Sequence, residues 1–261
     1  MKLEGWILIF VFVTLVALVA RPMGLYLTAV FEGRKTWLST ILAPLERGFY
    51  RLAGLKAEAE QDWKSYAGAL IVFSLAATLA LFALMQLQHL LPLNPQGLGP
   101  VPANVAMNTA VSFVTNTNWQ VYSGETTMSH LTQMAGLTVQ NFLSAAAGMA
   151  IAVAFARGFA RRSSGQIGNF WVDITRATLY VLLPISILFA GYLIAAGVPQ
   201  TLAGSLPAMT LEGAPQDIAV GPIASQEAIK MLGTNGGGFF NANSAHPFEN
   251  PTGLTNLLQM L

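Results

Sequence analysis

Two short polar segments hold the residues with the clearest chemical potential in this chain. Both are rich in threonine, asparagine and small residues, and both follow a semi-apolar stretch of helical character. Rings of backbone carbonyl oxygens can replace the hydration shell of a dehydrating potassium ion, and threonine can add a hydroxyl oxygen. We therefore predict a potassium-binding filter built from Thr115, Asn116, Thr117, Asn118 and Gln120 in the first segment and Thr234, Asn235, Gly236 and Gly237 in the second.

The second segment, residues 233–238, suits this chemistry well. Glycine lets the backbone turn successive carbonyls inward, and the preceding short helix, residues 225–232, points the negative end of its dipole toward the loop, which favours a cation. A phosphate-cradling loop is one competing interpretation, but the Gly-Lys-Ser/Thr ending and a preceding strand are both missing. A plain structural turn is the other, and the presence of two such loops argues against it. We expect no transition metal and no organic cofactor.

Superposing two Thr-Asn pairs reveals an internal repeat. Thr117-Asn118 matches Thr234-Asn235, and the same offset brings residues 136–138 onto residues 253–255, both Gly-Leu-Thr. Each copy runs as span, outer half-helix, polar loop and span. Repeats of this kind often hold the substrate site at their interface. The register of the first loop stays open by a few residues, because either Asn116 or Trp119 can take the place of Gly236.

Apolar helices must position these loops. Hydrophobic residues make up 54% of the 261 residues and charged residues 10%, against about 25% charged in a soluble domain. Segments 5–26, 66–91, 131–155 and 171–196 each approach or exceed the roughly 20 residues that cross a bilayer as a helix. Irregular loops are tolerated at membrane depth only inside protein or along water. The sequence thus predicts an all-α membrane protein of helix–pore-loop–helix units in contact with membrane lipid, and its net charge of +1 does not indicate nucleic-acid binding.

Basic residues orient the spans. They gather in residues 21–64 and 157–162, whereas the opposite side holds only Lys2 and Lys230, so the positive-inside rule predicts an N-terminus outside. A cleaved signal peptide is the alternative for the first apolar run, but its positive charge, Arg21, follows the run and its cleavage pattern is poor. The acidic residues of the outer segments either enrich cations at an entrance or are simply solvated; they are Glu125, Glu212, Asp217, Glu227 and Glu249.

Other polar residues have structural interpretations. Helical spacing predicts two ion pairs, Asp173 with Arg176 and Glu227 with Lys230. Pro184 should kink the fourth span. No paired carboxylates and no serine–histidine arrangement indicate a hydrolytic site.

Several long motifs are specific enough to indicate a family. Residues 108–120, 122–126, 133–144, 224–244 and 246–251 closely resemble the potassium-transporting ATPase A subunit family, and the resemblance covers essentially the whole chain. It implies a bacterial inner-membrane protein that selects and admits the ion, partnered by an ATP-hydrolysing P-type B subunit, a C subunit and a small F subunit. It also implies that Asn116, Thr117 and Asn118 line the first filter loop, and Thr234, Asn235 and Gly236 the second.

The same resemblance implies a superfamily fold of four helix–pore-loop–helix units, of which this sequence holds about two. We divide the chain into a leading transmembrane helix (1–30), a cytoplasmic loop (31–65), a first unit (66–156), a second cytoplasmic loop (157–170) and a second, truncated unit (171–261). The early stop suggests truncation, so a missing C-terminal half or a second copy would complete the filter. A truncated, non-conducting membrane scaffold subunit is the alternative function. A membrane-embedded enzyme is a third, disfavoured because no catalytic constellation is evident.

Overall fold

Four long apolar helices form the frame of the chain. A computed structural model describes residues 3–161 and 165–261; Lys2 and Arg162, two of the basic residues used to orient the spans, lie outside these ranges. The helices that are long and apolar enough to cross a membrane are Gly5–Phe31, Trp63–Leu90, Thr132–Ala160 and Phe170–Ala195. The predicted spans are therefore confirmed, with ends that differ by a few residues.

Three of the spans change helical type along their length. The first is a single helix, α1 (Leu3–Phe31). The others combine α-helix with a 3-10 or π-helical segment: α3 (Trp63–Leu87) with η1 (Gln88–Leu90), η2 (Thr132–Thr138) with α6 (Val139–Ala160), and α7 (Phe170–Arg176) with η3 (Ala177–Leu182) and α8 (Leu183–Ala195).

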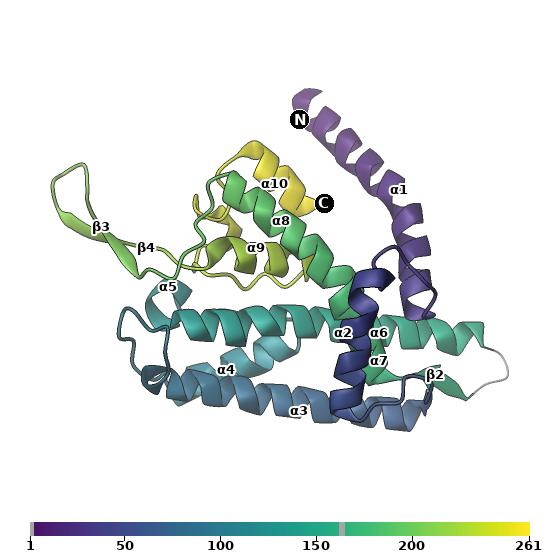
Figure 1. The fold of residues 1–261 in the computed structure, drawn as a ribbon. Helices are drawn as coiled ribbons and strands as arrows, with labels where there is room; N and C mark the ends of the chain where they lie inside the picture. The colour runs from purple at the N-terminus through teal and green to yellow at the C-terminus, as the bar shows by residue number, and fades with distance from the viewer. Residues whose placement is uncertain (1–2, 162–164) are drawn as a thin grey trace.

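The irregular stretch of the fourth span lies next to its proline. Pro184 is at the start of α8, directly after the π-helical η3. Proline removes a backbone donor, and π-helical turns are a common local adjustment in helices. In Figure 1, α8 lies at a clear angle to α6 of the third span.

Both predicted half-helices are present. The first is α4 (Ala103–Val114), which packs against α3 and α6; the second is α9 (Ile223–Leu232), which packs mainly against α8. Each has a separate apolar core, with Met85 and Phe113 buried around α4 and Leu193 and Ile223 buried around α9. Short helical turns follow the pore-loop segments: α5 (Gly124–Thr127), η4 (Asn243–Ala245) and α10 (Gly253–Met260).

Several elements were not predicted. An amphipathic helix, α2 (Ser39–Ala53), follows α1. A hairpin of β3 (Ser205–Met209) and β4 (Pro215–Ala219), paired from Ser205↔Ala219 to Met209↔Pro215, precedes α9 and projects from the body in Figure 1. A second small antiparallel pair, β1 (Gln61–Asp62) with β2 (Gln166–Gly168), joins the two loops at the other end of the spans.

The predicted Asp173–Arg176 ion pair is wrong. Asp173 instead accepts two hydrogen bonds from Arg157, at 2.6 and 2.9 Å, and a third from the Tyr66 hydroxyl at 3.2 Å. The Arg176 guanidinium bonds Glu46 of α2 at 2.9 Å. Spacing along one helix therefore predicted the wrong partners, because Asp173 and Arg176 each pair with a residue of a neighbouring helix.

Candidate ion-binding site

The two predicted filter loops lie in direct contact. Asn235 Nδ2 donates to Asn116 Oδ1. The Gln120 side chain makes two hydrogen bonds to the backbone of Gly238. Its Nε2 donates to Gly238 O at 2.9 Å, and its Oε1 accepts from Gly238 N at 3.2 Å. Residues more than 110 positions apart in the sequence are thus held together at one place.

The backbone leaves both half-helices along the same path. Thr117 N donates to Ser112 O at 2.9 Å and Asn235 N to Lys230 O at 3.1 Å, so each bond spans five residues at a helix end. Positive φ values follow, at Asn116 (61°) and Asn118 (58°) in the first loop and at Thr234 (54°) and Gly236 (100°) in the second. Such values are uncommon outside glycine, and their recurrence supports the predicted repeat.

The backbones of the two loops match at an offset one residue larger than that of the Thr-Asn pairs. The bonds from Thr117 N and Asn235 N coincide when residue 117 is placed on residue 235, and the positive φ values of Asn116 and Asn118 then fall on those of Thr234 and Gly236. Asn118 therefore takes the place of Gly236 in the backbone, rather than Asn116 or Trp119, the two residues that the sequence offered.

The loops turn their N–H groups back onto the helix ends and leave carbonyls unused. Within the described part of the chain, the carbonyl oxygens of residues 115–118 and 234–236 accept no hydrogen bond. The same holds for two buried side-chain oxygens, Asn118 Oδ1 and Asn235 Oδ1. Buried polar atoms are nearly always satisfied, so this concentration of free oxygens is a chemical feature of the site.

The third span forms a cradle beneath both loops. Asn141 of α6 accepts from Asn118 Nδ2 at 3.0 Å and donates to Gly237 O at 3.2 Å. One turn further, Ser144 Oγ donates to Asn116 Oδ1 at 3.0 Å and accepts from Asn235 Nδ2 at 3.2 Å. Our sequence-based set of site residues omitted both. The signal was available, because polar side chains within an apolar span usually face the interior of the bundle.

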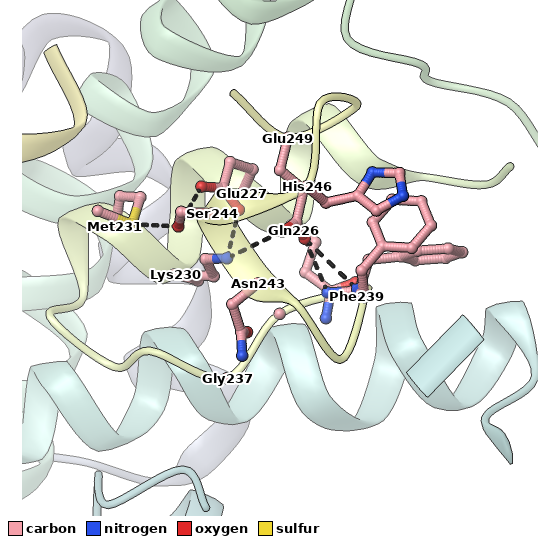
Figure 2. A network of polar contacts seen from close by, with 12 residues as sticks. Gln226, Glu227, Lys230, Met231, Gly237, Phe239, Asn243, Ser244, His246 and Glu249 are labelled. Atoms are coloured by element: carbon pink, nitrogen blue, oxygen red, sulfur yellow. Dashed lines mark hydrogen bonds and ion pairs between the residues drawn. The ribbon is translucent and has the colours of Figure 1, made fainter. Parts of the chain in front are cut away.

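A buried ionic cluster supports the second loop from behind. Lys230 Nζ lies 2.6 Å from Glu227 Oε2 and 3.4 Å from Glu249 Oε2, and all three side chains are at most 1% exposed. Figure 2 shows Lys230 between the two carboxylates. The Glu227–Lys230 pair predicted from spacing is therefore confirmed, with Glu249 as a third member.

Glu249 connects this cluster to the backbone of the loop. Its Oε1 accepts from Phe239 N at 3.1 Å and from Phe240 N at 3.5 Å. Burial raises the pKa of Glu249 to about 7, although Lys230 acts in the opposite direction. Neither interpretation of the outer acidic residues holds for Glu227 and Glu249, because both are buried and bonded within the protein; Glu212 and Asp217 are exposed.

Close packing explains most of the glycines in the second loop. A Cβ on Gly237 would lie 2.5 Å from Phe113 Cζ and 3.1 Å from Asn118 Cβ, and one on Gly238 would lie 2.6 Å from Lys230 Nζ. Gly236 is different: nothing lies within 4 Å of a Cβ there, and its φ is +100°. The loop is therefore tightly packed at Gly233, Gly237 and Gly238, and open at Gly236.

Comparison with known proteins identifies the family. The model of the potassium-transporting ATPase A subunit family matches residues 10–261. The proteins named potassium-transporting ATPase potassium-binding subunit from Granulibacter bethesdensis and Mesorhizobium japonicum are each 60% identical to this chain, and that from Brucella anthropi is 59% identical. Each alignment covers 100% of this chain and 46% of the relative, so the chain spans about half the length of these proteins. From the span arrangement, the paired loops and these matches together, the chain belongs to the potassium-transporting ATPase A subunit family.

Proposed function

We propose that this chain supplies two walls of a potassium-selective filter in an ATP-driven potassium uptake complex. The observation that carries the proposal is the pair of re-entrant loops, held together by Gln120 and Asn235, whose carbonyls at residues 115–118 and 234–236 are left without hydrogen bonds. Such oxygens are the groups that take the place of water around a potassium ion.

The electrostatics of the site favour a monovalent cation. Both half-helices end at the loops, so the negative ends of their dipoles face the site. The one lysine beneath the second loop, Lys230, is paired with two carboxylates and so does not present a free positive charge. Potassium is the transported substrate in this proposal and no organic cofactor is needed.

The wider setting comes from the family. The relatives' name describes a potassium-binding subunit of a potassium-transporting ATPase. We place this chain in the bacterial inner membrane with its N-terminus outside, beside a P-type B subunit that hydrolyses ATP, a C subunit and a small F subunit. The remaining walls of the filter come from a C-terminal half or from a second copy. The division of the chain into a leading helix, two cytoplasmic loops and two units remains a prediction.

Ion-dependent stability tests the proposal. The purified chain should melt at a higher temperature in potassium chloride than in the chloride of a bulky organic cation, because the loop carbonyls can coordinate a small monovalent ion but not a bulky one. Gly236→Asp should abolish this difference, since it places a side chain and a charge at the open position. Gly253→Asp is the matched control, at an exposed glycine with nothing within 4 Å of its Cβ, and should preserve the difference. Equal melting of the unmodified chain in both salts would favour a non-conducting scaffold.

A further inference from the structure

A basic cavity lies far from the filter loops, between the end of α1, the start of α2 and the fourth span. Its volume is about 580 Å³. Basic side chains and hydroxyl groups dominate its lining; they are Arg34, Lys35, Arg47 and Arg176, with Thr36, Ser39 and Thr40. Glu46 is the one acidic residue among the described residues that line it, and it is already bonded to Arg176 at 2.9 Å. The cavity therefore carries a net positive charge.

Two of its cations have no counter-charge among the residues that the structure describes. Lys35 and Arg47 form no ion pair with any described residue, although Arg47 Nε donates to Ala43 O at 3.2 Å. Both side chains are exposed, so an anion can approach them without a rearrangement of the fold.

An apolar groove adjoins the basic cavity. It has a volume of about 320 Å³ and runs between α1, represented by Val19 and Met23, and the α8 residues Ile185 and Leu188. The two hollows share Tyr180, and the turn at residues 36–39 lines both: Thr36 and Ser39 face the basic cavity, and Trp37 and Leu38 line the groove. The basic cavity thus adjoins the apolar groove, which runs along two of the apolar spans.

Helix α2 places this pair of hollows at a membrane surface. Its buried face holds Leu42, Glu46 and Tyr50, while Ile41 is 69% and Leu45 59% exposed. An amphipathic helix with exposed apolar residues and neighbouring basic residues is typical of the interface between headgroups and acyl chains. Figure 1 shows α2 running across the direction of α3 and α6, as a helix in the membrane plane does.

We propose that the basic cavity and the apolar groove together bind an anionic phospholipid, with the phosphate headgroup beside Lys35 and Arg47 and an acyl chain between α1 and α8. Charge complementarity selects an anionic headgroup, and the adjoining groove selects a molecule with a long apolar tail. A zwitterionic lipid offers no net charge to the cavity, and a soluble anion leaves the groove empty. Juxtamembrane lysine and arginine residues favour anionic lipid by an amount that corresponds to about 5-fold per residue.

Lipid retention measured by native mass spectrometry tests this proposal. The detergent-solubilised chain is incubated with equal amounts of phosphatidylglycerol and phosphatidylcholine of identical acyl chains. The unmodified chain should retain phosphatidylglycerol preferentially. The double variant Lys35→Gln/Arg47→Gln should reduce that preference by about 30-fold. Arg51→Gln/Lys56→Gln is the matched control, because it removes the same charge from exposed positions outside the cavity, and it should leave the preference unchanged.

Three outcomes would overturn the proposal. Equal retention of both lipids would mean an unspecific lipid annulus. Equal losses in the two double variants would mean diffuse charge attraction rather than a site. A third arm adds inorganic phosphate or glycerol phosphate: displacement of phosphatidylglycerol at equal concentration would assign the cavity to a soluble anion, whereas failure to displace it supports a lipid held by headgroup and chain together.

Discussion

The two filter loops follow the same initial path but are stabilised in different ways. The first is held by its own side chains: Thr115 Oγ1 donates to Val111 O at 2.9 Å, and Ser112 Oγ accepts from Trp119 N at 2.6 Å. The second is rich in glycine and has few side chains of its own to use. Its backbone is held by side chains from outside the loop: Gln120 and Asn141 bond Gly238 and Gly237. Glu249, which is paired with Lys230, accepts from the two amides that follow.

The two loops therefore have similar backbones that depend on different interactions: bonds within a few residues are prominent in the first loop, and bonds from side chains elsewhere in the sequence hold the second. The first loop has side-chain bonds within a few residues of the end of α4, in addition to its bonds to Asn141 and Ser144 of α6. The backbone directly after the second loop depends on Glu249, which is held in the buried cluster with Glu227 and Lys230. Removing one member of a buried ion pair leaves an uncompensated charge, which costs far more than the pair contributes. The second loop should therefore be the more sensitive of the two to remote substitutions.

The largest expected effect comes from Lys230→Met. This variant leaves two buried carboxylates without their cation, and we expect a loss of about 3–5 kcal/mol in the free energy of unfolding, measured by titration with a denaturing detergent. Hydrogen exchange should accelerate at the Phe239 and Phe240 amides, which Glu249 holds, and should change little in residues 115–120.

Two further variants make that result specific. Lys56→Met removes an exposed lysine and should change stability by less than about 0.5 kcal/mol. The triple variant Lys230→Met/Glu227→Gln/Glu249→Gln removes all three charges and should recover part of the loss, because no unpaired charge remains. Equal acceleration of exchange in both loops would contradict the distinction between them.

A smaller effect is expected where the loops touch. Gly237→Ala would place its Cβ 2.5 Å from Phe113 Cζ, and overpacking of this kind costs about 1–3 kcal/mol. Gly253→Ala, which meets nothing within 4 Å, is the control in the same thermal-melting measurement. Adding Phe113→Leu to Gly237→Ala should cost less than the sum of the single variants, since it makes room for the new methyl group. If the losses of stability in the two single variants simply add in the double variant, the side chain of Phe113 and the methyl group at position 237 do not interact.

How far the sequence predicts this molecule depends on the range of the interactions. Hydropathy located the four spans, because a bilayer imposes length and apolarity on each span separately. Composition located both loops. The partners of buried charges were harder to foresee: Asp173 bonds Arg157 rather than Arg176, and Glu249 joins Lys230 across 19 residues. Spacing along one helix contains no information on such contacts between elements.

The amphipathic helix α2 and the Asn141–Ser144 cradle were missed for another reason. Both carry signals that can be read from sequence: exposed and buried residues alternate with a helical period in α2, and polar residues interrupt the apolar third span. Residues 39–53 are too polar to form a span, and Asn141 and Ser144 lie within an otherwise apolar run, so hydropathy alone singled out neither. The one-residue difference between the sequence match and the backbone match of the two loops, by contrast, could be recognised only from backbone hydrogen bonds and φ values.

The smallest expected effect concerns the bridge between the loops. Gln120→Leu removes both hydrogen bonds to the Gly238 peptide while keeping similar bulk, and because the side chain is half-buried we expect a loss of only about 1–2 kcal/mol in the free energy of unfolding. Gln216→Leu, at an exposed position of β4, is the control. The informative readout is exchange at Gly238 N, which should accelerate although the cluster around Lys230 remains intact. If that amide stays protected in Gln120→Leu but not in Lys230→Met, the buried cluster alone holds the second loop, and the contact between the loops is a consequence of their positions and not a cause.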